Sequence, residues 1–293
     1  MNLYNIIDIY KALKKIGISK NDTVYICPEI YKLGKLNDAK DTTEYTAKFF
    51  KVIYDIIGPG GTIAINTYTF QVLREKKIFN YEKTVSSSGI FSEYIRKKKG
   101  SLRSVHPVFS VSAIGKNKKN ICSNNSLSNY GEGSPYQKFL DLNGKVLNLG
   151  MDPWLNPFLH VAEMKAGIST KFSKLSELTY IHNKKRKKKI FSNYVRYLSL
   201  TNDFDYSNFA KELKKKKLIK SAKLGDGKVH SVNASKYVSL LTSLLSNNQF
   251  YLIKKAPNLK KLKKIQKDFW IYLKFNVELI LENKFYNLII YIK

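Results

Sequence analysis

The stretch TEYTAKFFKVIYDIIGPGGTIAINTYTF, residues 43 to 70, passes from a helical pattern directly into a strand pattern. From Thr43 to Ile57, apolar side chains recur at the spacing of an amphipathic helix. The glycines of GPGG end this helix, and the β-branched run TIAINTYTF that follows is typical of a strand. The stretch therefore predicts a helix followed at once by a strand.

The same order of elements occurs elsewhere in the chain. Residues 2 to 16 have helical spacing, and the run DTVYICPEI after them indicates a short buried strand that ends at Pro28. GKVLNLG indicates another short buried strand, and a helix begins near Asn156 just after it. Helices that alternate with strands build layered domains, so we expect a fold of the α/β class.

The length and composition of the chain allow one sizeable core. The chain has 293 residues, 43% of them hydrophobic, which is a globular rather than a disordered composition. We expect a single domain over residues 1–293, with a basic inserted hairpin or loop near 180–200 that contains the run HNKKRKKK. Charged residues such as Lys274 and Glu278 interrupt the apolar tail 269–293, so we predict that it packs against the domain and does not cross a membrane.

The charge of the chain is strongly positive. Its 52 Lys and Arg residues against 22 Asp and Glu residues give a net charge of +30, which would attract polyanions. Lysine as the default solvated residue of an AT-rich genome explains the same charge without a ligand. Cys27 and Cys122 lie far apart without metal-ligand spacing, so we predict neither a disulfide nor a metal site, and a cytoplasmic protein.

His160 is the histidine whose surroundings favour chemistry, in the stretch FLHVAEMKAG. If Asn156 caps the helix and Pro157 is its first residue, His160 lies in the first turn, where the helix dipole favours a neutral ring. A neutral ring is what a general base needs, and Glu163 shares its helix face and could orient it. The spacing alone leaves a core histidine open, and no third ligand supports a metal.

The segment TVSSSG before another expected helix combines hydroxyls with a glycine. Such a turn at a helix entrance can hydrogen-bond an anionic ligand, because the first amides of the helix have no partners within it. Helix capping explains the same residues equally well.

Together, four strings in this order resemble the antibiotic N-acetyltransferase family, typified by aminoglycoside 3-N-acetyltransferases: GPGGTIAINTYTF, SSSGIFSEYIRKKKGSLRSVHPVFSVSAIG, YGEGSPYQKFLDLNGKVLNLG and NPFLHVAEMKAG. The resemblance runs from about Val24 to Gly167. It implies a layered α/β sandwich with a central, largely mixed β-sheet flanked by helices. It also implies transfer of an acyl group from acetyl-CoA, or another short acyl-CoA, to an amine.

The resemblance also implies roles for individual residues. His160 corresponds to the base, and Glu163 and Glu93 are both candidates to orient it or to bind the amine. The acyl-CoA region is implied to be lined by Ser87, Ser88, Gly89, Arg103, Ser104, His106, Pro107 and Ser110. This chain departs from the family's pattern at Cys27 and Pro28, at Phe109 and at His230.

These residues predict direct transfer in a ternary complex, with His160 taking the amine proton and backbone amides stabilising the oxyanion. Cys27 as a covalent acyl carrier is the alternative route. A protein of charge +30 is a poor host for a polycation, so we expect an anionic acceptor, a nucleotide-linked amino sugar for a surface glycan. The alternatives are an aminoglycoside acceptor and a non-catalytic polyanion-binding protein. A nucleic-acid partner is not expected, and no oligomeric state is predicted.

Overall fold

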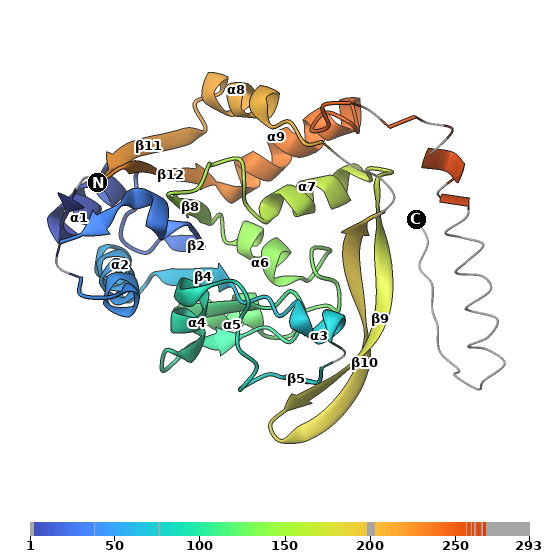
Figure 1. The fold of residues 1–293 in the computed structure, drawn as a ribbon, viewed down its shortest axis with the longest axis horizontal. Coiled ribbons are helices and arrows are strands. Elements are labelled where there is room, and N and C mark those ends of the chain that lie inside the picture. Colours follow the sequence, from blue (N-terminus) through green and yellow to red (C-terminus); the bar gives the residue numbers. More distant parts are fainter. Residues whose placement is uncertain are drawn as a thin grey trace.

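The structure is a computed structural model that describes residues 3–37, 39–75, 77–197 and 203–255, together with 257, 258, 260, 262–264, 266 and 267. Its central element is a seven-stranded sheet with helices on both faces (Figure 1). The strand order is β11-β12-β8-β2-β4-β7-β6. The strands of this sheet are β2 (Thr23–Pro28), β4 (Thr62–Asn66), β6 (Leu102–Arg103), β7 (Val111–Gly115), β8 (Lys145–Leu149), β11 (Ile219–Leu224) and β12 (Gly227–Asn233).

The sheet is parallel at its centre and antiparallel at its sides. Strand β2 pairs in parallel with β4 and with β8, whereas β7 and β12 pair antiparallel with their neighbours on both sides. The predicted α/β class and the largely mixed sheet are therefore confirmed.

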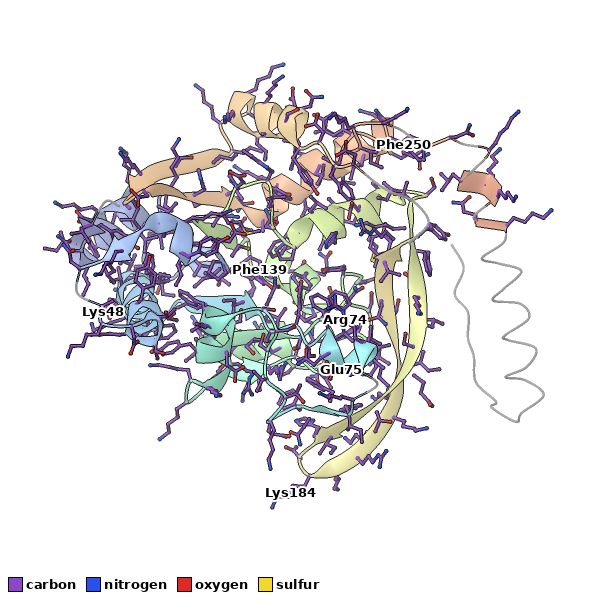
Figure 2. All side chains as sticks on the ribbon, in the orientation of Figure 1. Lys48, Arg74, Glu75, Phe139, Lys184 and Phe250 are labelled. Carbon is purple, nitrogen blue, oxygen red and sulfur yellow. The ribbon has the colours of Figure 1, made fainter. Side chains whose placement is uncertain are left out.

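Alternate residues of β2 point into two different cores. Val24 and Ile26 pack with the helices on one face, and Tyr25 and Cys27 pack with those on the other. The first face is covered by α1 (Ile6–Lys15), α2 (Thr42–Ile57) and α4 (Ile90–Lys97). The second is covered by α5 (Lys118–Cys122), α6 (Pro135–Asp141), α7 (Phe158–Ala166), α8 (Ser207–Lys215) and α9 (Ala234–Asn247). Figure 2 shows Phe139 of α6 in the middle of the molecule.

The stretch 43 to 70 forms the predicted helix and strand. Asp41 caps α2 by accepting a hydrogen bond from the amide of Glu44, and Gly58, with φ of 65°, ends it. Strand β4 stops at Asn66, earlier than the run TIAINTYTF predicts. Beyond it, the amides of Thr67 and Thr69 still donate to the carbonyls of Ser110 and Val108, so the segment remains tied to the chain beside it.

A long hairpin stands beside this sandwich (Figure 1). Its strands β9 (Lys171–His182) and β10 (Lys185–Arg196) are antiparallel, and β9 also pairs in parallel with β5 (Phe79–Asn80). The two residues of the turn, Asn183 and Lys184, have φ of 51° and 60°, as a tight hairpin turn needs. The hairpin begins at Lys171, not near 180 as the charge run suggested. Figure 2 shows Lys184 at its tip.

Four shorter elements complete the described structure. Strands β1 (Leu3–Tyr4) and β3 (Lys35–Leu36) pair in parallel, η1 (Ile30–Leu33) is a 3₁₀ turn, and α3 is a single turn at Gln71–Arg74. No helix within the described ranges is long and apolar enough to cross a membrane. The expected packing of the tail 269–293 concerns residues outside those that the structure describes.

Candidate active site

His160 lies at the start of α7, immediately beyond the loop that follows β8. Asn148 of β8 is fully buried and donates to the carbonyls of Asp152 and Leu155, at 3.0 and 3.1 Å, which holds this loop in place. The side chain of Asn156 accepts from the amide of Phe158 over 3.1 Å. The helix begins at Phe158, one residue after the predicted start at Pro157. His160 is still in the first turn, with its side chain 39% exposed.

The side chains of His160, Glu163 and Lys171, all ionisable, contact one another. Its Nδ1 lies 2.7 Å from Oε2 of Glu163 and 3.0 Å from Nζ of Lys171, and Lys171 also donates to the same Glu163 oxygen. Burial alone would raise the pKa of the Glu163 carboxyl, but the hydrogen bonds and charges of His160 and Lys171 hold that pKa below its ordinary value. Burial lowers the pKa of the Lys171 ammonium, and Glu163 offsets only part of this effect.

A chain of tyrosine hydroxyls runs from the sheet to Tyr130, whose ring packs beside that of His160. The ring of Tyr130 lies 5.1 Å from the His160 ring, and its hydroxyl is 3.2 Å from that of Tyr68. Tyr68 is 2.6 Å from the hydroxyl of Tyr136, which donates to Oδ1 of Asn66 over 2.9 Å. Burial raises the pKa values of all three tyrosines, so their hydroxyls keep their protons and link the end of β4 to the site.

The serine turn, residues 86–89, lies against the loop that follows β4. The amide of Ser87 donates to the carbonyl of Tyr68 over 2.7 Å, and Oγ of Ser88 accepts from the amide of Tyr68 over 3.0 Å. Gly89 then starts α4 with φ of 96°, and a side chain placed on it would meet nothing within 4 Å. Ser87 and Gly89 are exposed. The turn therefore faces open space at a helix entrance.

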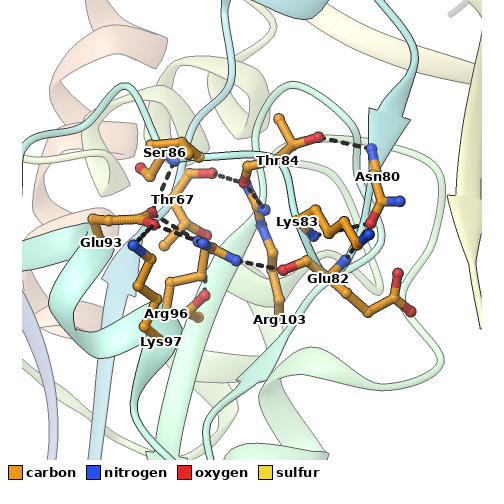
Figure 3. Close-up of polar contacts among 12 residues, drawn as sticks. Thr67, Asn80, Glu82, Lys83, Thr84, Ser86, Glu93, Arg96, Lys97 and Arg103 are labelled. Carbon is orange, nitrogen blue, oxygen red and sulfur yellow. Dashed lines mark hydrogen bonds and ion pairs between the residues drawn. The ribbon is translucent and has the colours of Figure 1, made fainter.

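Arg103 is a buried side chain that holds the segments next to this turn together through hydrogen bonds (Figure 3). It donates to Oγ of Ser110 and to the carbonyls of Thr84 and Thr67, at 2.9, 2.7 and 2.8 Å. Burial, with the nearby Arg96, lowers the pKa of its guanidinium to about 9. With 4% exposure and all three nitrogens bonded inside the protein, Arg103 joins three chain segments.

The rest of the predicted RS-HP-S string is also internal. Oγ of Ser104 accepts from the amide of Val111 over 2.9 Å, and the carbonyl of Pro107 accepts from Thr69. Nδ1 of His106 accepts from the amides of Val108 and Phe109, both at 3.2 Å, and burial lowers the pKa of His106 to about 4. These internal contacts show that Arg103, Ser104, His106, Pro107 and Ser110 support the loop under the serine turn, and their place along the acyl-CoA region stays a prediction.

Glu93 belongs to this support as well and not to the group around His160. Its carboxylate accepts from Nε and Nη2 of Arg96, at 2.7 and 2.6 Å, and from the amide of Ser86, at 3.0 Å (Figure 3). Burial would raise its pKa, but Arg96 and Ser86 lower it to about 2. Of the two glutamates that the sequence left open, Glu163 is the one that contacts His160.

Sequence reasoning missed Lys171 and the tyrosine chain. Lys171 is one of many lysines, and neither its spacing nor its neighbours single it out. Cys27, the alternative acyl carrier, is 5% exposed, and burial raises the pKa of its thiol, so a reactive thiolate is disfavoured. Across the described part of the chain, no group of three or more His, Cys, Asp or Glu side chains could hold a metal ion.

Comparison with known proteins gives a consistent result. A family model described as aminoglycoside 3-N-acetyltransferase matches residues 36–246. An aminoglycoside N(3)-acetyltransferase III from Salmonella sp is 24% identical over 181 residues, which cover 56% of this chain and 61% of that protein. A protein of the same name from Acinetobacter baumannii is also 24% identical, with the same coverage. The chain thus matches less than two thirds of the length of these relatives.

Solved structures share the fold over most of the chain. AAC-IIIb in its binary structure with CoASH has a TM-score of 0.72 at 21% identity, covering 87% of this chain and 100% of that one. The aminoglycoside acetyltransferase AAC(3)-Xa has a TM-score of 0.71 at 19% identity, covering 86% and 95%. The YokD protein from Bacillus subtilis has a TM-score of 0.68 at 20% identity, covering 84% and 100%.

Proposed function

Because the chain belongs to the aminoglycoside 3-N-acetyltransferase family, we propose that it transfers an acetyl group from acetyl-CoA to an amine. The observation that carries this proposal is the contact between Nδ1 of His160 and the buried carboxylate of Glu163, on a histidine whose side chain is 39% exposed. A histidine oriented in this way is the arrangement that a general base requires.

The chemistry follows from the proton of the amine. An ammonium has no free lone pair, so the acceptor must react as a neutral amine that loses a second proton during attack. Nε2 of His160 takes that proton while the new N–C bond forms, and the ring charge is stabilised by Glu163 at Nδ1. The C–S bond of the thioester then breaks, and the proton passes to the departing sulfur. The products are an amide and the CoA thiol.

The serine turn is the part of the chain that suits the acyl donor. Ser87 and Gly89 are exposed, and the first amides of α4 lie next to them. Hydroxyls and free helix amides donate hydrogen bonds to phosphate groups, and the positive end of the helix dipole attracts them. A glycine lets the phosphate approach the backbone closely. Ser87, Ser88 and Gly89 would therefore hold acetyl-CoA, with Arg103 and its neighbours holding the turn.

Two observations favour different acceptors. The curated relatives are named for aminoglycosides, which favours an aminoglycoside amine. The net charge of +30 favours the anionic nucleotide-linked amino sugar that the sequence suggested, but the relatives' names give that acceptor no support. We place the aminoglycoside first. Both candidates are amino sugars, and a common panel separates them.

A thiol-release assay with acetyl-CoA tests the proposal. The acceptors are aminoglycosides, simple amino sugars and nucleotide-linked amino sugars. With the best acceptor, His160→Ala should lower kcat by about 10²- to 10⁴-fold, which is the usual contribution of a general base. His182→Ala is the matched control, because His182 lies at the end of β9 against Tyr81, in the outer part of the hairpin. Undiminished turnover in His160→Ala would remove the base, and no thiol release with any amine would overturn the function.

A further inference from the structure

We propose that Lys171 is a positioning residue: it acts through Glu163 to keep the free lone pair of His160 on Nε2, the ring nitrogen opposite the one that Glu163 and Lys171 contact. The inference rests on the proposed function, in which that lone pair accepts the amine proton. It concerns a residue that lies beyond the helix that carries the histidine and glutamate.

The position of Lys171 is well defined. It is the first residue of β9, its side chain is 8% exposed, and its Nζ lies 5.6 Å from the centre of the Tyr194 ring. From there it contacts both Nδ1 of His160 and Oε2 of Glu163. Glu163 itself is 2% exposed. The chain thus places a buried cation against a buried anion beside Nδ1 of His160.

Nδ1 of His160 cannot satisfy both neighbours at once. A carboxylate needs a hydrogen on Nδ1, whereas an ammonium needs a lone pair there. Glu163 is the closer neighbour, at 2.7 Å against 3.0 Å for Lys171, and its carboxyl is ionised because its pKa is lowered. Nδ1 therefore carries the hydrogen, Lys171 donates to Glu163, and the lone pair of the neutral ring is on Nε2.

The hydrogen bond and charge of His160, and then those of Lys171, lower the pKa of the buried Glu163 carboxyl, and Lys171 is the contributor that stays charged when the ring is neutral. Besides His160 and Lys171, the groups whose charge or protons act on Glu163 are buried or half-buried tyrosines from four other parts of the chain: Tyr130, Tyr194, Tyr206 and Tyr237. Arg196, at the end of β10, repels the Lys171 ammonium. Without Lys171, burial would favour the protonated Glu163. Protonated Glu163 would donate to Nδ1, and the hydrogen of the neutral ring would move to Nε2, where no base would remain.

Four variants of the full chain test this inference: Lys171→Met, Lys171→Arg, Glu163→Gln and the double variant Lys171→Met/Glu163→Gln. The first readout is ¹⁵N NMR of the His160 ring at pH 7, with His160→Ala to assign its signals. We expect the lone pair on Nε2 in the wild type and on Nδ1 in Lys171→Met. Because this readout needs no turnover, it separates a failure of the inference from a failure of the proposed function.

The second readout is the pH dependence of kcat/KM. Lys171→Met should lower kcat/KM at pH 7 at least tenfold and move the acid limb to higher pH, because more hydroxide is needed to ionise Glu163. Lys171→Arg, which keeps the charge, should retain most of the activity. In the Glu163→Gln background, Lys171→Met should change kcat/KM less than twofold, because the carboxylate through which Lys171 acts is absent.

Two results would overturn the inference. One is an unchanged ring tautomer and pH profile in Lys171→Met. The other is a loss of more than tenfold when Lys171→Met is added to Glu163→Gln, which would show that Lys171 acts without Glu163. If Lys171→Met does not fold because it leaves a buried carboxylate unpaired, the second comparison still decides, since the double variant carries no buried charge at either position.

Discussion

Ser86 and Glu93 are joined across the entrance of α4: the amide of Ser86 donates to Oε2 of Glu93 over 3.0 Å, and Arg96 holds the same carboxylate from the other side. The serine turn thus has a charged anchor. The anchor is separate from Glu163, which contacts His160, so the two glutamates serve different parts of the proposed site. Substitutions of Glu93 and of Glu163 should therefore change different kinetic properties.

Glu93→Gln should weaken binding of the acyl donor and leave the base untouched. Loss of the carboxylate breaks the pair with Arg96 and loosens the turn, so we expect KM for acetyl-CoA to rise about tenfold, equivalent to about 1.4 kcal/mol. The acid limb of the kcat/KM profile should stay where it is. Glu177→Gln on the exposed hairpin is the control. A shifted acid limb with an unchanged KM would instead place Glu93 beside the base.

Arg103→Met should destabilise the fold. Its loss removes a donor from Oγ of Ser110 and from the carbonyls of Thr67 and Thr84, and the Thr67 carbonyl keeps the Ser110 hydroxyl as a donor. Unpaired buried groups cost about 1–3 kcal/mol each, and relief from burying the guanidinium offsets part of this, so we expect a loss of about 2–4 kcal/mol. Chemical denaturation measures it. Arg74→Met, on the exposed turn α3, should change the free energy of unfolding by less than about 0.5 kcal/mol. Equal losses in the two variants would contradict the stabilising role of the Arg103 hydrogen bonds.

His106 should make the fold sensitive to mild acid. Its folded pKa of about 4 lies below the ordinary value of 6.5, so the unfolded chain binds a proton that the folded chain excludes. The contribution of the neutral ring is complete above pH 6.5 and is lost as pH falls toward 4, by about 3 kcal/mol in all.

The matched variant for this prediction is His106→Asn. An asparagine oxygen can accept the amides of Val108 and Phe109 as Nδ1 does, but it does not titrate. Urea unfolding between pH 7 and pH 4 should therefore show a steeper loss of stability in the wild type than in His106→Asn. Parallel curves for the two proteins would refute the prediction.

Local patterns predicted those parts of the fold whose reason lies within a few residues. The helix over Thr43 to Ile57 shows its buried face in its own spacing, and it ends at a glycine. The sequence pattern does not reveal the start of β9 at Lys171, because only one of its twelve residues is buried and the strand lacks a buried alternating face. Strand β9 is specified by its pairing with β10, and the sequence of β9 alone does not reveal that pairing.

The same distinction applies to the site. His160 and Glu163 are three residues apart on one helix, so their contact follows from spacing. Lys171 joins them from the next element, and its role depends on the path of the chain between Gly167 and β9. The RS-HP-S string was recognisable as a motif, but the string alone does not tell whether Arg103 faces a ligand or supports a loop. The burial of Arg103 and its three internal acceptors show the support of the loop, which the string alone does not reveal.

The basic segment Lys185–Lys189 at the start of β10 should bind polyanions independently of catalysis. All five residues are exposed, and because successive side chains of a strand alternate, Lys185, Lys187 and Lys189 share one face. Replacing these three lysines by glutamate should lower the salt concentration at which the protein elutes from heparin, since fewer counterions are exchanged. Turnover of the best acceptor should not change.

The matched control reverses three exposed lysines of α1, Lys11, Lys14 and Lys15, which alters the net charge by the same amount. If the hairpin is the binding surface, the α1 variant should elute close to the wild type. Equal shifts in both variants would mean that the overall charge, and not this surface, governs the binding. A hairpin variant that keeps its fold but loses acyl transfer would show that the basic strand takes part in substrate binding, contrary to the separation expected here.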